Sequence, residues 1–526
     1  MLTRIAAAYF AWFLAPLLLA SVYRPIALWD YLTSPDLLHF GRPITWLTLI
    51  PNTFFHLLNN TFIVRPTVSV LYDLQTLVFG GEFWLWYCVK WCAFLASVYL
   101  VTAILRHLGC DWYTQAAIAA LLLFHPARFT LMLHAPDGWL ALGMCAQLVL
   151  LGRYGFEVRA MPFSARLLWL LLALFTVGAK EAGYVFQMLL AAFLLVRCPA
   201  AWLRLVPHAA LIAFWTWRLK AASGRAQGFV FTDFVERLRL HAEMSFPATP
   251  LRIFELALAA LAAWSLLIAW RKRTELSGQL ILFCWLAAGA MLVFVSIPNL
   301  TALRYVIPMV YLAAVPLGIA LQHIRRHRVA LAGVFIVVFP IVMAGHIYRQ
   351  ELGYQDQFYP TSELLRRLEM KARQGYSLVI SEGANDIAAE PLTSVEYFFS
   401  TYGPHWYGQS APRKLHRAKQ QGWPAQAFVM ASYFGPDHVV AETGIDIRRI
   451  ERVEVFYGAD LGTLQKLTGR YQYIDRLLHR TQHYHNDTGA PEPTSKPRFY
   501  LYTVGAPHDG GYNYEPVAGS RLPGAF

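Results

Sequence analysis

Long apolar runs, separated by short polar segments, fill the first two thirds of the chain. Runs of spanning length, or nearly so, lie at about 5–22, 83–105, 113–126, 137–152, 166–179, 183–197, 205–218, 251–270, 278–297, 304–322 and 329–347. A straight helix needs about 20 apolar residues to cross the hydrocarbon core, and tilt or local thinning accommodates other lengths. The pattern predicts a polytopic α-helical membrane protein with about eleven transmembrane helices.

Two stretches between the first and second runs are too short or too polar to span. FGRPITWLTLIPNTFFHLLNN and RPTVSVLYDLQTLVFGGE carry apolar residues on a helical stripe that is broken at Pro51 and Pro66. Such a stripe is typical of a helix that lies in the membrane interface. We therefore expect two interfacial helices in this loop.

A polar tail follows the last apolar run. Thr361 and Ser362 precede a stretch of good helix formers, and Gly375 follows it, which predicts a helix with a defined start and stop. SLVIS, VEYFFSTY, RVEVFYG and RFYLYTV are typical of strands. We expect a transmembrane domain at residues 1–347 and a soluble, mixed α/β domain at residues 348–526.

Composition agrees with a membrane protein. Hydrophobic residues make up 57% of the chain and charged residues 15%, and the mean hydropathy of +0.39 is too high for a soluble protein of this length. The net charge of +13 does not indicate nucleic acid, because the basic residues are distributed by loop and form no basic module.

The distribution of basic residues sets the orientation. With the N-terminus in the cytoplasm, most of them fall on the inside: Arg4, Arg106, Arg153, Arg159, Arg166, Arg197, Arg204, Arg271, Lys272, Arg273, Arg325, Arg326 and Arg328. The short outer loops carry only Arg128, Lys180 and Arg304. This asymmetry satisfies the positive-inside rule. It predicts a multi-pass membrane protein with the tail on the outer face, and we expect that membrane to be a bacterial inner membrane and that face to be the periplasm.

The segment at 23–48, directly after the first run, holds the strongest candidates for chemistry. It contains Asp30, Asp36, His39 and Arg42. Carboxylates and a guanidinium beside a membrane span suit a site where a charged lipid head group meets a proton acceptor. Asp30 lies in the apolar setting ALWDYL, whereas Asp36 follows a turn-like Ser-Pro pair and suits a helix cap. Asp30 is therefore our candidate base, with Asp36 as the alternative.

Other ionisable residues gather at the outer ends of later runs. They are His134 and Asp137 in HAPDG, Lys180 and Glu181 in GAKEAG, and Arg304 and Tyr305 in ALRYVIP. Unpaired charges at this depth are costly, so such groups pair, extend toward the interface or bind something charged. The structural alternatives are a mutual Lys180–Glu181 ion pair and an interfacial anchor at Arg304.

Taken together, these motifs resemble the GT-C superfamily of integral-membrane glycosyltransferases, which use lipid-phosphate sugars. Protein O-mannosyltransferases and the aminoarabinose transferases that modify lipid A belong to the same group. The likeness covers about residues 1–345 and rests on an acidic residue after the first helix, interfacial helices in that loop, the AKE turn and the RYVIP motif. Many members have adjacent acidic residues in the first loop, whereas Asp30 and Asp36 are separated here.

The resemblance implies an inverting transfer of one sugar from a polyprenyl-phosphate donor to a periplasmic protein, lipid or glycan. Asp30 or Asp36 would take the acceptor's proton, and cations would stabilise the departing phosphate. The phosphate ligands would be Arg304, Tyr305, Lys180 and Arg42. Glu181, His134, Asp137 and His39 would bind sugar or acceptor, or orient the basic groups. No cofactor is required, although Asp30, Asp36 and His39 leave a divalent cation open.

Two other functions are consistent with parts of the sequence. An oligosaccharide ligase or polymerase that uses a pyrophosphate carrier would need more than one outer arginine for its second phosphate, which Arg42, Arg128 and Arg304 could supply. A transporter or flippase of lipid-linked sugars would have internal repeats and ionisable groups near mid-membrane. We find no repeat, and Lys90 and Glu255 are the main charges away from helix ends.

Overall fold

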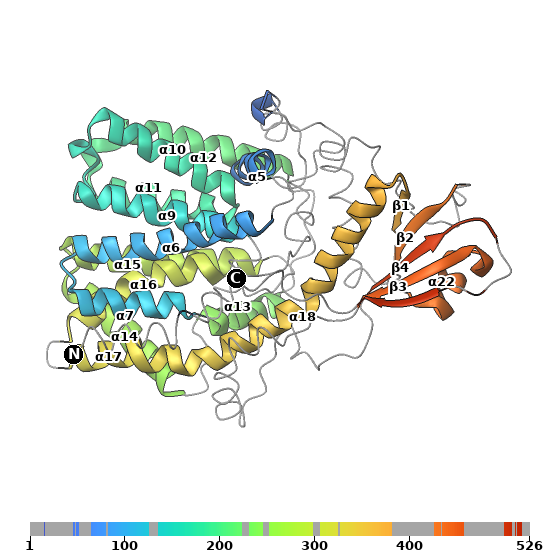
Figure 1. Cartoon of the computed structure of the whole chain (residues 1–526). Coiled ribbons are helices and arrows are strands. Elements are labelled where there is room, and N and C mark those ends of the chain that lie inside the picture. The colour runs from blue at the N-terminus through green and yellow to red at the C-terminus, as the bar shows by residue number, and fades with distance from the viewer. Residues whose placement is uncertain are drawn as a thin grey trace.

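The computed structural model describes residues 15, 46–47, 49–51, 65–79, 83–125, 135–222, 231–245, 252–297, 306–324, 327–380, 426–432, 434–456, 499–507, 511 and 513–517. Two parts are evident in Figure 1: a bundle of roughly parallel and antiparallel helices, and a small sheet beyond one end of it. The expected combination of apolar helices with a small C-terminal sheet is confirmed. The first apolar run lies almost entirely outside the described residues.

Helices cover every expected apolar run from the second onward. The bundle contains α6 (Phe83–His107), α7 (Trp112–Leu123), α9 (Ala135–Arg153), α10 (Phe163–Ala179), α11 (Ala182–Arg197), α12 (Trp202–Ala222), α14 (Arg252–Arg271), α15 (Leu276–Ser296), α16 (Ile307–Gln322), α17 (Arg328–Gly333), the π-helical η6 (Val334–Val338) and α18 (Phe339–Arg373). The short 3-10 helices η3 (Val158–Ala160) and η4 (Pro199–Ala201) join neighbouring helices. Asp111 caps α7, because its side chain accepts a hydrogen bond from the Thr114 backbone N–H.

Length and composition separate the clear spans from the shorter helices. Among the described residues four helical segments are long and apolar enough to cross a membrane: Cys88–His107, Phe254–Arg271, Leu276–Ser296 and Arg328–Gly345. The pair Ala182–Arg197 and Pro199–Trp217 passes the same test jointly but is bent by 120°. Trp112–Leu123, Phe163–Ala179 and Ile307–Gln322 are apolar but shorter. The expected number of about eleven spans therefore stays a prediction.

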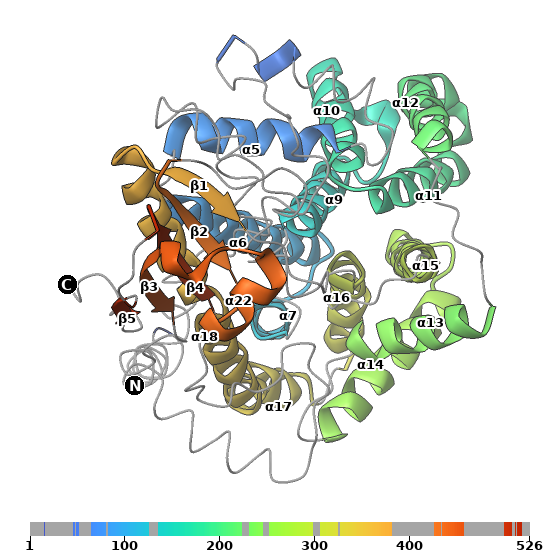
Figure 2. The same ribbon diagram turned by 90° about the vertical axis from the view of Figure 1, so that its right-hand side faces the viewer.

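Two helices of different character lie at the end of the bundle that faces the sheet. α5 (Pro66–Phe79) runs crosswise to the bundle axes in Figures 1 and 2, as expected for an interfacial helix. α13 (Phe231–Ser245) is amphipathic and packs against α15. The first expected interfacial stretch, at 40–60, falls almost wholly outside the described residues.

The last membrane helix does not stop where the sequence pattern changes. α18 continues from Phe339 to Arg373 through the expected domain boundary at 347, so the separate helix that we expected to begin at Thr361 is wrong. Its predicted end is confirmed, because Gly375 has φ +88°, a conformation that favours glycine. Tertiary contacts explain the continuity: Leu364, Leu368 and Ala372 are buried in one apolar cluster with sheet residues.

The tail folds as a five-stranded mixed sheet between two helices. The strands are β1 (Ser377–Ile380), β2 (Phe428–Ser432), β3 (Ile450–Phe456), β4 (Phe499–Val504) and β5 (Asn513–Val517), in the order β1-β2-β4-β3-β5. The β1–β2 and β3–β5 pairs are parallel, and the other two are antiparallel. Three predicted strands are confirmed, VEYFFSTY lies outside the described residues, and β2 and β5 were not predicted.

Alternating residues of the sheet pack into two different hydrophobic clusters. Val429 and Ala431 of β2 join the cluster that contains α18, whereas Phe428 and Met430 face the cluster of Val439 in α22 (Pro436–Thr443). Successive strand side chains point to opposite faces, so a strand covered on both sides is apolar throughout. The 3-10 turn η7 (Ile447–Arg449) leads into β3.

Candidate functional site at one end of the bundle

The structure describes three of the ten predicted site residues and brings them together. Asp137, Lys180 and Glu181 lie where α9, α10 and α11 begin or end. The others lie outside the described residues: Asp30, Asp36, His39, Arg42, His134, Arg304 and Tyr305. The positive-inside rule predicts that this end of the bundle faces outward. α5 and the C-terminal sheet lie toward the same end (Figure 1).

Lys180 is a buried ammonium with a buried partner. Its backbone is extended at φ −161° and ψ 152°, so α10 ends and the side chain enters the bundle. The Lys180 Nζ donates a hydrogen bond to Oδ1 of Asp137, in the first turn of α9. Their side chains are 7% and 2% exposed. A carboxylate at a helix N-terminus is also favoured by the helix dipole. Asp137 therefore stabilises both the start of α9 and the charge of Lys180.

Glu181, the next residue, pairs with Arg65. The Arg65 Nε donates to Oε1 of Glu181 at 3.2 Å, and its Nη2 donates to Oε2 at 3.0 Å. Burial alone would raise the pKa of the Glu181 carboxyl, but the Arg65 charge and hydrogen bonds hold that pKa below its ordinary value. The bidentate geometry fixes the guanidinium plane. Lys180 therefore pairs with Asp137, and Glu181 pairs with Arg65, instead of with each other. In this geometry the two carboxylates orient the two cations.

Close contact with α10 fixes α5, and hence Arg65. The Thr67 hydroxyl donates to the carbonyl oxygen of Phe175 at 3.0 Å. A Cβ at Gly178 would lie 2.4 Å from the Thr67 Oγ1 and 3.2 Å from a Pro66 side-chain carbon. Pro66 suits the first helical position, where its missing N–H costs nothing. The small residue at 178 thus lets α5 lie directly on the end of α10.

α13 contributes a further basic cluster at the same end. The Arg237 Nε donates to the backbone carbonyl of Ser296 at 2.9 Å, at the C-terminus of α15, where a cation is favoured. The His241 Nδ1 lies 2.9 Å from the Ser296 hydroxyl. Because that hydroxyl donates to Leu292, the imidazole Nδ1 is the donor. Burial, together with the charges of Arg237 and Lys180, lowers the pKa of His241 to about 4, so the imidazole is neutral at pH 7.

The described part of the site is therefore rich in fixed cations. Lys180, Arg65 and Arg237 hold their charges in set positions, and carboxylates or helix-end carbonyls orient them. An array of this kind stabilises an anion that forms or departs at the membrane surface. We did not single out Arg65 from the sequence. The available signal was its position just before Pro66, at the start of a predicted interfacial helix.

No group of three His, Cys, Asp or Glu side chains is placed to hold a metal ion in the part of the chain that the structure describes. The residues for which the sequence leaves a divalent cation open, Asp30, Asp36 and His39, lie outside that part.

The three comparisons with known proteins gave one likeness. No family model matches the sequence, and no curated protein matches it. Two solved structures of ArnT from Cupriavidus metallidurans are similar in shape. The apo structure shares 14% identity and a TM-score of 0.48, over 86% of this chain and 96% of that one. The structure bound to undecaprenyl phosphate shares 13% identity and a TM-score of 0.49, over 84% of this chain and 95% of that one.

Proposed function

We propose that this protein is a GT-C type membrane glycosyltransferase of a bacterial inner membrane. It takes a single sugar from a polyprenyl-phosphate carrier and transfers it to a periplasmic acceptor, with inversion. One observation supports the proposal: one end of the bundle holds a buried Lys180–Asp137 pair beside a bidentate Arg65–Glu181 pair. A lipid-bound phosphate would meet both pairs at the membrane surface.

The proposed reaction is a displacement at the anomeric carbon. An acceptor oxygen or nitrogen attacks that carbon, the bond from the carbon to the phosphate oxygen breaks, and polyprenyl phosphate leaves with the bonding electrons. The attacking group loses its proton to a carboxylate, for which we propose Asp30, with Asp36 as the alternative. Arg304, Tyr305 and Arg42 complete the phosphate ligands, and His39 and His134 contact sugar or acceptor.

Lys180 and Arg65 would act on the leaving group. Negative charge grows on the phosphate as the bond breaks, and cations already held in position stabilise it without first having to reorganise. Asp137 and Glu181 keep those cations in place but are not themselves phosphate ligands, because they are anions. Guanidinium can grip two phosphate oxygens, whereas an ammonium acts as a compact charge.

Release of polyprenyl phosphate tests this function. The purified full-length protein would be incubated with polyprenyl-phosphate sugars and an envelope extract as the source of acceptor. We expect release from at least one donor, and loss of release in Lys180→Met. Lys272→Met is the matched control, since Lys272 forms an exposed ion pair with Glu275 in the turn before α15. Failure of the wild type to release polyprenyl phosphate from any donor would refute the proposal.

Arg65 also favours a second candidate, a ligase or polymerase that uses a pyrophosphate carrier. Such an enzyme needs cations for two phosphates, and Arg65 adds an outer guanidinium near Lys180. The mass of the modified acceptor separates the two functions. An increment of one sugar supports the single-sugar transferase, and an increment of a whole oligosaccharide supports the ligase.

A further inference from the structure

Two arginines cross-link the short turns that precede α10 and α12, at the end of the bundle that lies away from the sheet (Figure 1). Arg159 of η3 donates from Nη2 to the carbonyl oxygen of Ala200 in η4. In return, Arg204 of α12 donates from Nη1 to the carbonyl oxygens of Val158, at 3.3 Å, and of Arg159. These bonds hold two guanidiniums close together, and most of their N–H groups remain available to another acceptor.

No carboxylate neutralises this group of cations. Arg166, near the start of α10, is a third guanidinium at the same helix ends, and neither α10 nor α12 has an acidic residue in its first turn. Within the described part of the chain none of the three arginines forms an ion pair, and Glu157, the nearest acid in the sequence, is exposed and forms none either. The positive ends of two helix dipoles add to the charge. Cations at these positions therefore favour an anion from outside the protein.

A stack of two rings places Arg166 and Arg204 along one seam between α10 and α12. The Trp169 ring of α10 lies on the His208 imidazole of α12, with centroids 3.5 Å apart and an angle of 24° between the planes. Arg166 precedes Trp169 by three residues, and Arg204 precedes His208 by four. Residues at these spacings share a helix face, so each arginine lies one turn nearer the start of its helix than the ring on the same face. Both guanidiniums thus lie beside the seam, closer to the end of the bundle than the stack.

The stack beneath the arginines supplies no negative charge. His208 and Trp169 are 4% and 1% exposed, and the ring nitrogens of both have no hydrogen-bond partner among the described residues. The Nε of Arg166 is a further buried nitrogen without a partner there. An indole N–H is only a donor, and an imidazole is neutral or positive. Because buried donors without partners are costly, this layer favours an acceptor just as the arginines do.

Apolar side chains surround the arginines on the outside of the bundle. Phe163 and Leu167 of α10, and Trp202, Leu203 and Val206 of α12, are all exposed, Phe163 the most at 72%. The same short segments thus combine guanidiniums with a surface suited to hydrocarbon, and an exposed indole is typical of the head-group layer. A free ion would contact only the guanidiniums, whereas a lipid with an anionic head group would contact both.

We propose that this seam binds the phosphate of an anionic membrane phospholipid. The three arginines bind the phosphate oxygens, which match the fork geometry of a guanidinium, and Phe163 and Trp202 contact the upper part of the acyl chains. The site lies at the opposite end of α10 from Lys180, and it does not depend on the proposed transfer reaction. The positive-inside rule predicts that this end faces the cytoplasm, so the lipid would come from the cytoplasmic leaflet, which is rich in anionic head groups.

Native mass spectrometry of the full-length protein, released from nanodiscs of phosphatidylglycerol and phosphatidylcholine, tests the site. We expect the wild type to retain phosphatidylglycerol in preference to phosphatidylcholine. Arg166→Gln and Arg204→Gln each remove one guanidinium, and we expect each to weaken the binding of phosphatidylglycerol about tenfold, as for a lost hydrogen bond to a charged group. Arg204→Lys keeps the charge but not the fork, so it should weaken binding less.

Arg166 forms no side-chain bond within the described residues, so its replacement should leave the fold intact. Arg271→Gln is the matched control, since Arg271 is an exposed arginine in the last turn of α14 and its loss removes the same charge. We expect this control to retain phosphatidylglycerol as the wild type does.

Three results would overturn the proposal. Unchanged retention in Arg166→Gln and Arg204→Gln, or an equal loss in Arg271→Gln, would exclude a site at the seam. Displacement of phosphatidylglycerol by an equal concentration of inorganic phosphate would exclude a lipid as the occupant. Preferential retention of polyprenyl phosphate at the seam, lost in the same two variants, would exclude a phospholipid as the occupant.

Discussion

Removing the carboxylate that neutralises Lys180 is the sharpest test of how the site is held. In Asp137→Asn the side chain keeps its shape but loses its charge. Lys180 is only 6% exposed, and its side chain points into the bundle. It would then either stay charged without this counter-charge or lose its proton. Either outcome weakens the folded state, and the second also removes a cation from the proposed phosphate site.

The size of the effect follows from the burial of both partners. Breaking a buried ion pair by removing one partner costs about 3–5 kcal/mol, because the remaining charge is left uncompensated. An Asn amide oxygen can still accept one hydrogen bond from Lys180, so we expect the lower end, about 3 kcal/mol. Loss of a favourable charge in the first turn of α9 contributes about 0.3–1 kcal/mol of this total.

Reversible unfolding in mixed detergent micelles would measure the free energy of unfolding. Glu275→Gln is the control, since its ion pair with Lys272 has side chains 37% and 56% exposed and should contribute at most about 1 kcal/mol. The double variant Asp137→Asn with Lys180→Met should recover most of the loss, because neither charge of this pair remains. A single variant that costs under about 1 kcal/mol, with no recovery in the double variant, would refute this account of the site.

Asp30→Asn is expected to abolish transfer while leaving donor affinity largely unchanged, whereas Asp36→Asn should cost about 1 kcal/mol of stability as a lost cap. Normal turnover in the first variant with none in the second would reverse the assignment of the base. Gly178→Ala should destabilise by about 1–3 kcal/mol, because its Cβ meets α5, while Gly289→Ala, with nothing within 4 Å, should not lower the melting temperature. Stability should fall as pH falls from about 6.5 toward 4, because His241, with its pKa lowered to about 4, takes up a proton in the unfolded chain first. His241→Gln should flatten that slope, and an unchanged slope would exclude His241 as its source.

The apolar pattern by itself was enough to predict the helices of the bundle. Each expected run from 83–105 onward coincides with a helix. In lipid, the backbone N–H and C=O groups of a long apolar stretch can hydrogen-bond only to one another, and a helix satisfies them all. The same logic, applied to a stretch too polar to span, predicted the crosswise helix α5. The basic residues of the loops predict which end faces outward. None of these features depends on which helices are neighbours.

Local signals were less informative in the tail. Thr361 and Ser362 have the chemistry of a helix start, yet α18 passes through them without a break. Burial of Leu364 and Leu368 against the sheet outweighs a capping preference, which is worth only about 1 kcal/mol. Gly375 did end the helix, because its φ of +88° is costly for other residues.

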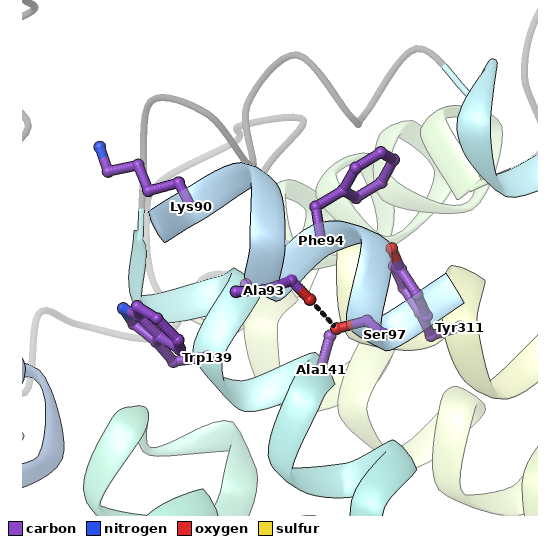
Figure 3. A pocket seen from close by; sticks show the side chains of 8 residues that line it. Lys90, Ala93, Phe94, Ser97, Trp139, Ala141 and Tyr311 are labelled. Carbon is purple, nitrogen blue, oxygen red and sulfur yellow. Dashed lines mark hydrogen bonds between the residues drawn. The ribbon is translucent and has the colours of Figure 1, made fainter. Parts of the chain in front are cut away.

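The sequence predicted that Asp137, Lys180 and Glu181 lie on one side of the membrane, but only the tertiary structure decided their partners. Lys180 and Glu181 are adjacent in the chain and of opposite charge, which favoured a mutual pair. Instead, the chain reverses direction between them, so Lys180 faces α9 and Glu181 faces Arg65 before α5. Lys90, Trp139 and Tyr311 likewise lie near one another only because α6, α9 and α16 pack together (Figure 3). Helix formation depends on local composition, whereas a contact between residues 116 positions apart depends on how the helices pack.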